Sequence, residues 1–317
     1  MTQNSSFTTH PMSTVNIAIC HYPFASMSAI YGWKELFEMA NSLCERLGLE
    51  VNFAPKIVDS FTAVDEHYAV IFLPPSTNPE FYSKPQAALS SWLDQHHQQG
   101  AILTSACAGA FLLAQTHAAQ QKSLTTHWGL VESFKHNYPQ LTLEPDAILI
   151  DHSDVISAGG MMSWLDLALA LVSRFSDERV ARDLGKTLVI DTAPRRQTYY
   201  QQFTPSYLHG DKRIIEVQQY ISNQIRHPLP IGDLAAKVNL TIRTFQRRFV
   251  KATGITPVQY IQKVRVQHMC DRLEASNDSF EFIALNAGYE DASACRKVFV
   301  KLMGLTPSEF RRRFKRR

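Results

Sequence analysis

Short apolar runs alternate with amphipathic stretches over the first 190 residues of the chain. The apolar runs are typical of buried parallel strands and lie at residues 15–20, 51–55, 68–74 and 101–106. Amphipathic helices that end near a glycine are predicted at residues 33–48 and 85–100. Residues 146–160 predict two further strands with a turn, and residues 161–175 predict a helix. This alternation predicts a three-layer, flavodoxin-like α/β sandwich.

The last hundred residues follow a different pattern, in which one helical unit occurs twice. The segment GITPVQY at 254–260 matches GLTPSEF at 304–310 position for position, 50 residues further along. Upstream, residues 233–249 align with residues 282–299, with one extra residue in the second copy. Each copy predicts a short apolar helix, a tight turn and a second helix, which is the plan of a helix-turn-helix unit.

The second helix of each copy has suitable residues at both of its ends. Thr241 and Asp291 are favoured N-cap types, and Gly254 and Gly304 can adopt the left-handed conformation that ends a helix. Phe245 and Phe249 in the first copy, and Cys295 and Phe299 in the second, are four positions apart and are predicted to pack inward. Polar side chains on the opposite face are candidate DNA contacts. They are Arg243, Gln246, Arg247 and Lys251 in the first copy, and Ser293, Arg296 and Lys297 in the second.

These side chains have the chemistry that reading a base sequence requires. The fork of an arginine can donate two hydrogen bonds to guanine, glutamine can pair with adenine, and serine makes a small, adaptable contact. Lys251 and the RRRFKRR segment at 311–317 are expected to contact phosphates. Phosphate contacts add salt-dependent affinity without adding sequence information.

The charge is divided unevenly along the chain. Residues 212–317 contain 20 Lys and Arg against 9 Asp and Glu, whereas residues 1–211 contain 12 against 20. A basic final third attached to an acidic remainder favours a polyanion-binding module. No apolar run approaches the roughly 18 residues that a membrane span needs, and the polar residues 1–13 predict a disordered tail. Five scattered cysteines without CxxC spacing favour reduced thiols in a cytoplasmic protein.

The basic third resembles the AraC/XylS family of transcription regulators over about residues 212–316. The motifs that carry the resemblance are IGDLAAKVNLTIRTFQRRFVKATGITPVQYIQKVRV and IALNAGYEDASACRKVFVKLMGLTPSEFRRRF. The resemblance implies two helix-turn-helix units joined by a long helix near residues 256–273. The two recognition helices would then enter successive major-groove segments, about 34 Å apart on one face of a duplex. Cys295 departs from the family, which usually has a bulky apolar residue there.

A single cysteine marks the candidate site of the first part. In TSACAGAF (104–111), Cys107 lies at a turn between a predicted strand and a helix predicted at 108–118. Ligands bind at this edge of such sheets, and amides at the start of a helix would favour the thiolate and lower the pKa of Cys107. His127, in TTHW, follows 20 residues later as a candidate partner.

Residues 14–190 resemble the PfpI/ThiJ-like superfamily, which is related to class I glutamine amidotransferases, through SACAGAFLLAQ and TTHW. Fusion to an AraC-type C-terminal part resembles the GlxA-type transcription regulators. The chain departs from the enzymes of the superfamily at two places. At the first, Ala29 aligns with their acidic residue, and Trp33 aligns with a proline four positions later. Pro74-Pro75-Ser76 replaces the PGG turn, and Pro75 has no N–H to stabilise an oxyanion. Losing one such donor costs ~10²–10³ in rate, so a poor hydrolase is expected.

Three roles remain open for Cys107. It could fill space as an inherited elbow, or contribute to a ligand-sensing pocket with His127, Trp33 and Trp128. It could also act as a redox sensor or support residual catalysis. The histidines show no metal-ligand spacing, and neither a metal nor a cofactor is expected.

The sequence therefore predicts a sequence-specific DNA-binding transcriptional regulator without enzyme activity. A sensing and dimerisation domain is assigned to residues 14–190, a linker to 191–211 and the DNA-binding domain to 212–317. The expected partners are double-stranded DNA, a small-molecule effector and a second copy of the chain, with RNA polymerase as a further candidate and no membrane. The competing hypothesis is a cysteine-dependent hydrolase or amidase that carries a basic domain.

Overall fold

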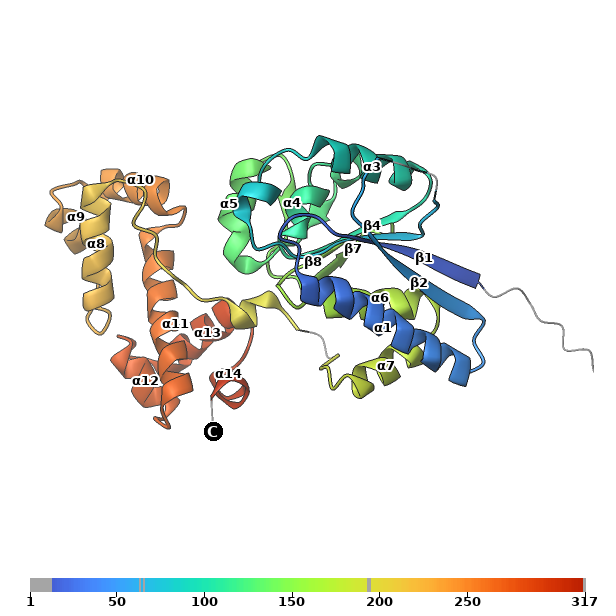
Figure 1. Cartoon of the computed structure of the whole chain (residues 1–317). Helices are drawn as coiled ribbons and strands as arrows, with labels where there is room; N and C mark the ends of the chain where they lie inside the picture. The colour runs from blue at the N-terminus through green and yellow to red at the C-terminus, as the bar shows by residue number, and fades with distance from the viewer. Residues whose placement is uncertain (1–12, 63, 65, 193–194, 316–317) are drawn as a thin grey trace, which may run out of the picture. The chain divides into compact units, whose positions relative to one another are not determined.

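The computed structural model describes residues 13–62, 64, 66–192 and 195–315, in two units that meet in the sequence at Gln197 and Thr198 (Figure 1). The predicted tail lies outside the described residues except for Ser13, which belongs to the first strand. The last two arginines of the RRRFKRR segment lie outside them as well.

A six-stranded sheet forms the centre of the first unit. Its strands run in the order β2-β1-β3-β4-β8-β7, all parallel except β7, which is antiparallel to β8. In that order the strands are Val51–Val58, Ser13–Cys20, Val70–Leu73, Ile102–Ala106, Val155–Ala158 and Leu149–Asp151. Two short strands, β5 (Ser123–Leu124) and β6 (Thr142–Leu143), pair separately. The order of the parallel strands is that of doubly wound, flavodoxin-like sheets, whose ligands bind beyond the carboxyl ends of the strands.

Helices cover both faces of this sheet (Figure 1). On one face lie α1 (Met27–Arg46), α6 (Trp164–Phe175) and α7 (Glu178–Thr187); on the other lie α3 (Ala87–Gln98), α4 (Gly109–Leu113) and α5 (Val131–Asn137). The short α2 spans Pro79–Tyr82, and 3-10 turns occur at His117–Ala119, Trp128–Leu130 and Gln197–Tyr200. The predicted three-layer sandwich is therefore confirmed.

Two predicted helix starts are wrong. The first helix begins at Met27 and not at residue 33, because its first turns bury Ala29 and Ile30 against the core. The helix predicted from residue 161 begins at Trp164, because Met161 and Met162 form an exposed turn before it.

The second unit is helical and has two separate apolar cores. Its helices are α8 (Lys212–Asn223), α9 (Ile231–Lys237), α10 (Ile242–Thr253), α11 (Pro257–Ala275), α12 (Phe280–Asn286), α13 (Ala292–Met303) and α14 (Pro307–Phe314). One core joins α8, α9 and α10 to the start of α11 around Phe245 and Phe249. The other joins α12, α13 and α14 to the rest of α11 around Phe299. Helix α11 therefore connects two lobes, as the resemblance to the AraC/XylS family implies for residues 256–273 (Figure 1).

The helix ends follow the repeat closely. The Thr241 side chain accepts a hydrogen bond from the Thr244 N–H, and the Asp291 carboxylate accepts from the N–H groups of Ser293 and Ala294. Gly254 and Gly304 end the second helix of each lobe with φ angles of 75° and 70°. These local signals explain why the second unit could be predicted from its sequence.

The segment assigned to a linker packs largely on the second unit. The Phe203 N–H donates to the Gln267 side chain over 2.9 Å, and the Phe203 ring lies edge-on to Tyr260. Asp211 accepts two hydrogen bonds from the Arg248 guanidinium, which lower the pKa of its carboxyl. No helix among the described residues is long and apolar enough to cross a membrane.

Candidate functional site

The backbone around Cys107 forms a strained elbow at the carboxyl end of β4. Cys107 has a φ of 54°, which is uncommon for a residue other than glycine. Its N–H donates to the Ala158 carbonyl over 2.8 Å, and its carbonyl accepts from the Thr126 hydroxyl over 2.7 Å. A Cβ at Gly109 would lie 2.3 Å from the Leu73 carbonyl oxygen. The elbow is therefore held tightly between the ends of β3 and β8.

The thiol of Cys107 is buried, and this overturns the predicted thiolate. Burial raises the pKa of Cys107 to about 11, and the opposing hydrogen bond from the Ala108 N–H is too weak to compensate. The predicted helix at 108–118 is only the five-residue α4, whose partial charge is correspondingly small. Desolvation therefore exceeds the helix effect, and the thiol is protonated at neutral pH.

Alkylation of Cys107 by iodoacetamide is expected to be slow at pH 7. A pKa near 11 leaves about one thiol in 10⁴ ionised, against a few per cent for a free cysteine. The labelling rate should rise about tenfold per pH unit above pH 7, measured as the difference between the wild-type protein and Cys107→Ser. Rapid labelling at pH 7 that disappears in this variant would reveal an activated thiolate and favour the redox hypothesis.

Two tyrosines that are not among the predicted site residues lie beside the elbow, together with a proline turn. Burial raises the pKa of Tyr22 and of Tyr82, and a charged Cys107 would raise both further. The Tyr22 hydroxyl donates to the Pro74 carbonyl, and the Pro75 carbonyl accepts from the Ser26 N–H. No sequence motif signals these tyrosines, because folding brings Tyr22, which follows β1, and Tyr82, the last residue of α2, to the elbow from distant parts of the chain.

His127 and Trp128 form a second part of the site. Their rings are 5.0 Å apart, and the His127 Nδ1 accepts a hydrogen bond from the Gly129 N–H over 3.0 Å. Burial lowers the pKa of His127, so a neutral ring is favoured. Within the described part of the chain, no hydrogen bond joins His127 to Cys107; the connection runs through Thr126, their shared neighbour.

Trp33 lies elsewhere, in the hydrophobic core. Its side chain is 0% exposed, stacks on Phe72 at 3.7 Å, and donates from Nε1 to the Trp164 carbonyl over 2.9 Å. All of its surface is thus already used for packing. The prediction that Trp33 contacts a ligand with His127 and Trp128 is at odds with this position.

A buried glutamine outside the predicted set organises the His127 segment. The Gln197 side chain donates from Nε2 to the carbonyls of Thr126 and Ala147 over 2.8 and 2.9 Å, and accepts from the Trp128 N–H over 3.1 Å. It is the last residue of the first unit. The position of the His127 segment therefore depends on a residue 70 positions further along the chain.

The second unit exposes the polar face that its sequence predicts on α10. Arg243, Gln246, Arg247 and Lys251 are exposed, whereas Phe245 and Phe249 are fully buried. Residues three and four apart lie on one side of a helix, so Arg243, Gln246 and Arg247 share a face. Ser293 and Lys297 are exposed at the equivalent positions of α13.

Arg296 differs from its counterpart Gln246 in its surroundings. Its guanidinium lies 4.7 Å above the Phe280 ring and donates to the Glu281 carboxylate over 3.2 Å, which leaves the side chain 43% exposed. In the first lobe, Ile231 and Gly232 occupy the positions aligned with Phe280 and Glu281. The exposed polar face of α13 therefore holds one of its cations in a fixed place, whereas that of α10 does not.

Comparison with known proteins begins with the second unit. Residues 234–313 match a model described as a helix-turn-helix domain. The second unit is a helix-turn-helix domain. This match covers both repeated copies, so it includes α10 and α13 with their polar faces.

Similarity to known regulators extends beyond this domain. The chain is 24% identical over 225 residues to the HTH-type transcriptional regulator CdhR of Pseudomonas aeruginosa, covering 71% of this chain and 67% of CdhR. It is 22% identical over 214 residues to the HTH-type transcriptional regulator GlxA of Rhizobium meliloti, covering 65% of this chain and 63% of GlxA. Both matches are longer than the segment Thr198–Arg317 and therefore include part of the first unit. The predicted similarity to GlxA-type regulators is confirmed.

A solved structure aligns with about half of the chain. It is an AraC family transcriptional regulator from Pseudomonas putida, with a TM-score of 0.45 and 17% identity, covering 55% of this chain and 99% of that chain. Among the described residues of the present structure, no three His, Cys, Asp or Glu side chains gather as a metal site would require.

Proposed function

We propose that this protein is a sequence-specific DNA-binding transcriptional regulator whose first unit senses an effector without catalysing a reaction. The observation that carries the proposal is the repeated helix-turn-helix unit, with a polar, cationic face exposed on both second helices. CdhR and GlxA, which match across both units, are themselves transcriptional regulators by name.

The spacing of the two lobes supports binding to one duplex. Helix α11 has 19 residues and a length of about 28 Å at 1.5 Å per residue. The N-terminal part of α11 packs on the lobe of α10, and its C-terminal part packs on the lobe of α13. This length is close to the roughly 34 Å between successive major-groove segments on one side of B-DNA. We assign base contacts to Arg243, Gln246, Arg247, Ser293, Arg296 and Lys297, and a phosphate contact to Lys251.

The first unit supports sensing better than catalysis. A hydrolase would need an activated thiol, an acid or base near it, and a donor for the oxyanion. Burial keeps the Cys107 thiol protonated, Ala29 is a buried alanine, and Pro75 offers no N–H. We assign a small-molecule effector site to the elbow of Cys107 and the His127–Trp128 pair, without Trp33. The proposal also includes that the protein forms a homodimer, acts in the cytoplasm and has RNA polymerase as a partner.

Filter binding of the full chain to genomic promoter fragments at several salt concentrations tests the proposed function. At least one fragment should bind with nanomolar affinity, and the affinity should fall steeply as salt increases because phosphate contacts release counterions. Uniform micromolar binding to every fragment would contradict the proposal and leave the hydrolase or amidase hypothesis as the alternative.

Replacing Glu281 by glutamine is expected to reduce sequence discrimination by the second lobe. The substitution frees Arg296 from its ion pair and removes a negative charge beside the reading face, so non-specific DNA should bind about two- to fivefold more tightly. Specific binding should gain less, because the released arginine loses its fixed orientation. Competition binding with specific and random duplexes measures the ratio. Glu290→Gln, at an exposed carboxylate near the start of α13, controls for net charge; equal effects of both variants would show that the Arg296 pair is irrelevant.

A further inference from the structure

A cavity of about 280 Å³ lies in the second unit, and none of the residues assigned to base contacts lines it. It is lined by Arg226, His268, Arg272, Phe282, Ile283 and Asn286. These residues come from the loop after α8, from α11 and from α12. The cavity therefore lies where the loop of the first lobe meets the helices of the second.

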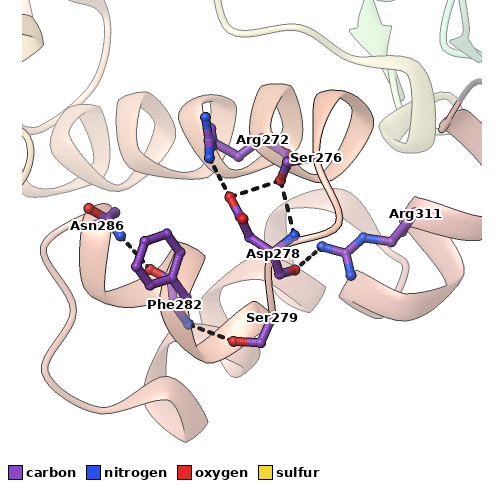
Figure 2. Close-up of polar contacts among 7 residues, drawn as sticks. All are labelled: Arg272, Ser276, Asp278, Ser279, Phe282, Asn286 and Arg311. Carbon is purple, nitrogen blue, oxygen red and sulfur yellow. Dashed lines mark hydrogen bonds and ion pairs between the residues drawn. The ribbon is translucent and has the colours of Figure 1, made fainter.

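The ionisable side chains that line this cavity are all basic. Arg226 is exposed and makes no ion pair within the described residues. Arg272 pairs with the Asp278 carboxylate, which also accepts from the Ser276 hydroxyl over 3.0 Å (Figure 2). Arginine has five N–H donors, so this pairing holds Arg272 in position and leaves donors for a further acceptor.

The charges of Arg226 and Arg272 affect the pKa of His268, which lines the same cavity. Burial lowers the pKa of His268, and the positive charges of Arg226 and Arg272 lower it further, against the opposite effect of Asp271. Arg226, His268 and Arg272 line the same cavity, so one ligand in it can contact both guanidinium groups. A planar guanidinium suits a carboxylate or phosphate, which can accept two parallel hydrogen bonds from it.

The remaining lining of the cavity consists of two apolar residues, Phe282 and Ile283, and of Asn286. Phe282 is 52% exposed, and Ile283 is buried. The Ser279 hydroxyl accepts from the Phe282 N–H, and the Asn286 side chain donates to the Phe282 carbonyl over 2.9 Å (Figure 2). The backbone that presents the exposed ring is therefore fixed, although the ring itself is largely open to solvent.

We propose that this cavity binds a small organic anion, with its carboxylate or phosphate group held by Arg226 and Arg272 and its apolar body against Phe282. The volume lies at the lower end of the range for ligand sites, so the ligand is small. A second ligand site within the DNA-binding unit goes beyond the proposed function, which places effector binding in the first unit.

Such a ligand would bridge the two lobes. Arg265 of α11 already donates to the carbonyls of Ile225 and His227 over 3.1 and 2.8 Å, and its guanidinium lies 5.3 Å from the Tyr289 ring centre. A bound anion would add a second connection between this loop and α11, and would tie the loop to α12. The ligand would then restrict movement of α10 relative to α13. It would thereby alter the affinity of the protein for DNA sites whose two half-sites differ in spacing.

Binding is tested on the full chain without DNA. Benzoate, phenyl phosphate and inorganic phosphate are titrated at constant ionic strength, with NMR detection of the His268 ring and calorimetry of the heat released. We expect saturable binding of benzoate or phenyl phosphate, with a shift of the His268 signals. Arg226→Gln should weaken this binding at least about tenfold, because it removes an unpaired guanidinium. Arg213→Gln, at an exposed arginine of α8, should leave the affinity unchanged.

Three results would overturn the proposal. The first is the absence of saturable binding by either organic anion. The second is equal binding by the wild-type protein and Arg226→Gln. The third is a lower salt slope of DNA binding in Arg226→Gln without any binding of small anions, because the cavity would then contact a phosphate of the DNA backbone. Specific DNA binding by the wild-type chain is measured separately, so a failure here leaves the proposed function standing.

Discussion

Replacing Arg247 by alanine is expected to weaken binding to a specific DNA site by about 1–3 kcal/mol and to relax the base preference at one position. Arg247 is exposed on α10, whereas Phe245 and Phe249 are buried on the opposite face, so the helix presents Arg247 without using it for packing. An arginine in this position can donate two hydrogen bonds to one guanine, and alanine removes both.

The measurement compares the variant with the wild-type protein on the specific fragment and on its three single-base variants at the affected position. Arg213→Ala provides the matched control, since it removes the same charge from an exposed site on α8. A loss of similar size on all sequences, with a salt slope lower by about one, would show that Arg247 contacts a phosphate.

The second unit was largely predictable because its signals are local. N-cap side chains, left-handed glycines and the pairs Phe245–Phe249 and Cys295–Phe299 act within a few residues of each other, and the structure places each as the spacing predicts. The repeat adds a second, independent instance of the same pattern. The ion pair of Arg296 was not predicted, because its partner Glu281 lies on the preceding helix.

The first unit was predictable as a fold but not as a site. Strand order follows from the alternation of strands and helices, whereas the chemistry of Cys107 depends on desolvation by side chains that folding brings together. The position of Trp33 could not be predicted for the same reason. Its separation from Cys107 in the sequence does not indicate that the Phe72 ring stacks on it. The sequence offers no sign that Gln197 and Tyr22 belong to this region, since their partners are 50 to 72 positions away.

Replacing Gln197 by alanine is expected to lower the free energy of unfolding of the first unit by about 3 kcal/mol. The substitution leaves the Trp128 N–H and the Thr126 carbonyl without their buried partner, and each unsatisfied group costs about 1–3 kcal/mol. The melting temperature should fall by about 6–12 °C for a unit of this size. All four tryptophans, including Trp128, lie in the first unit, so tryptophan fluorescence reports its unfolding selectively.

The control for this prediction is Gln120→Ala, which changes an exposed glutamine of the same unit and should leave the melting temperature nearly unchanged. If both variants melt alike, the hydrogen bonds of Gln197 contribute nothing to stability. The fluorescence of Trp128 should also change before unfolding, because its segment loses the side chain that fixes it beside His127.

Gln197 directly precedes Thr198 in the sequence. The Thr198 hydroxyl and the neighbouring Tyr199 ring lie within 3.0 Å of where a Cβ on Gly304 would be. If Gln197→Ala changes the effector response but leaves DNA affinity unchanged, this result would identify Gln197 as a link between sensing and DNA binding.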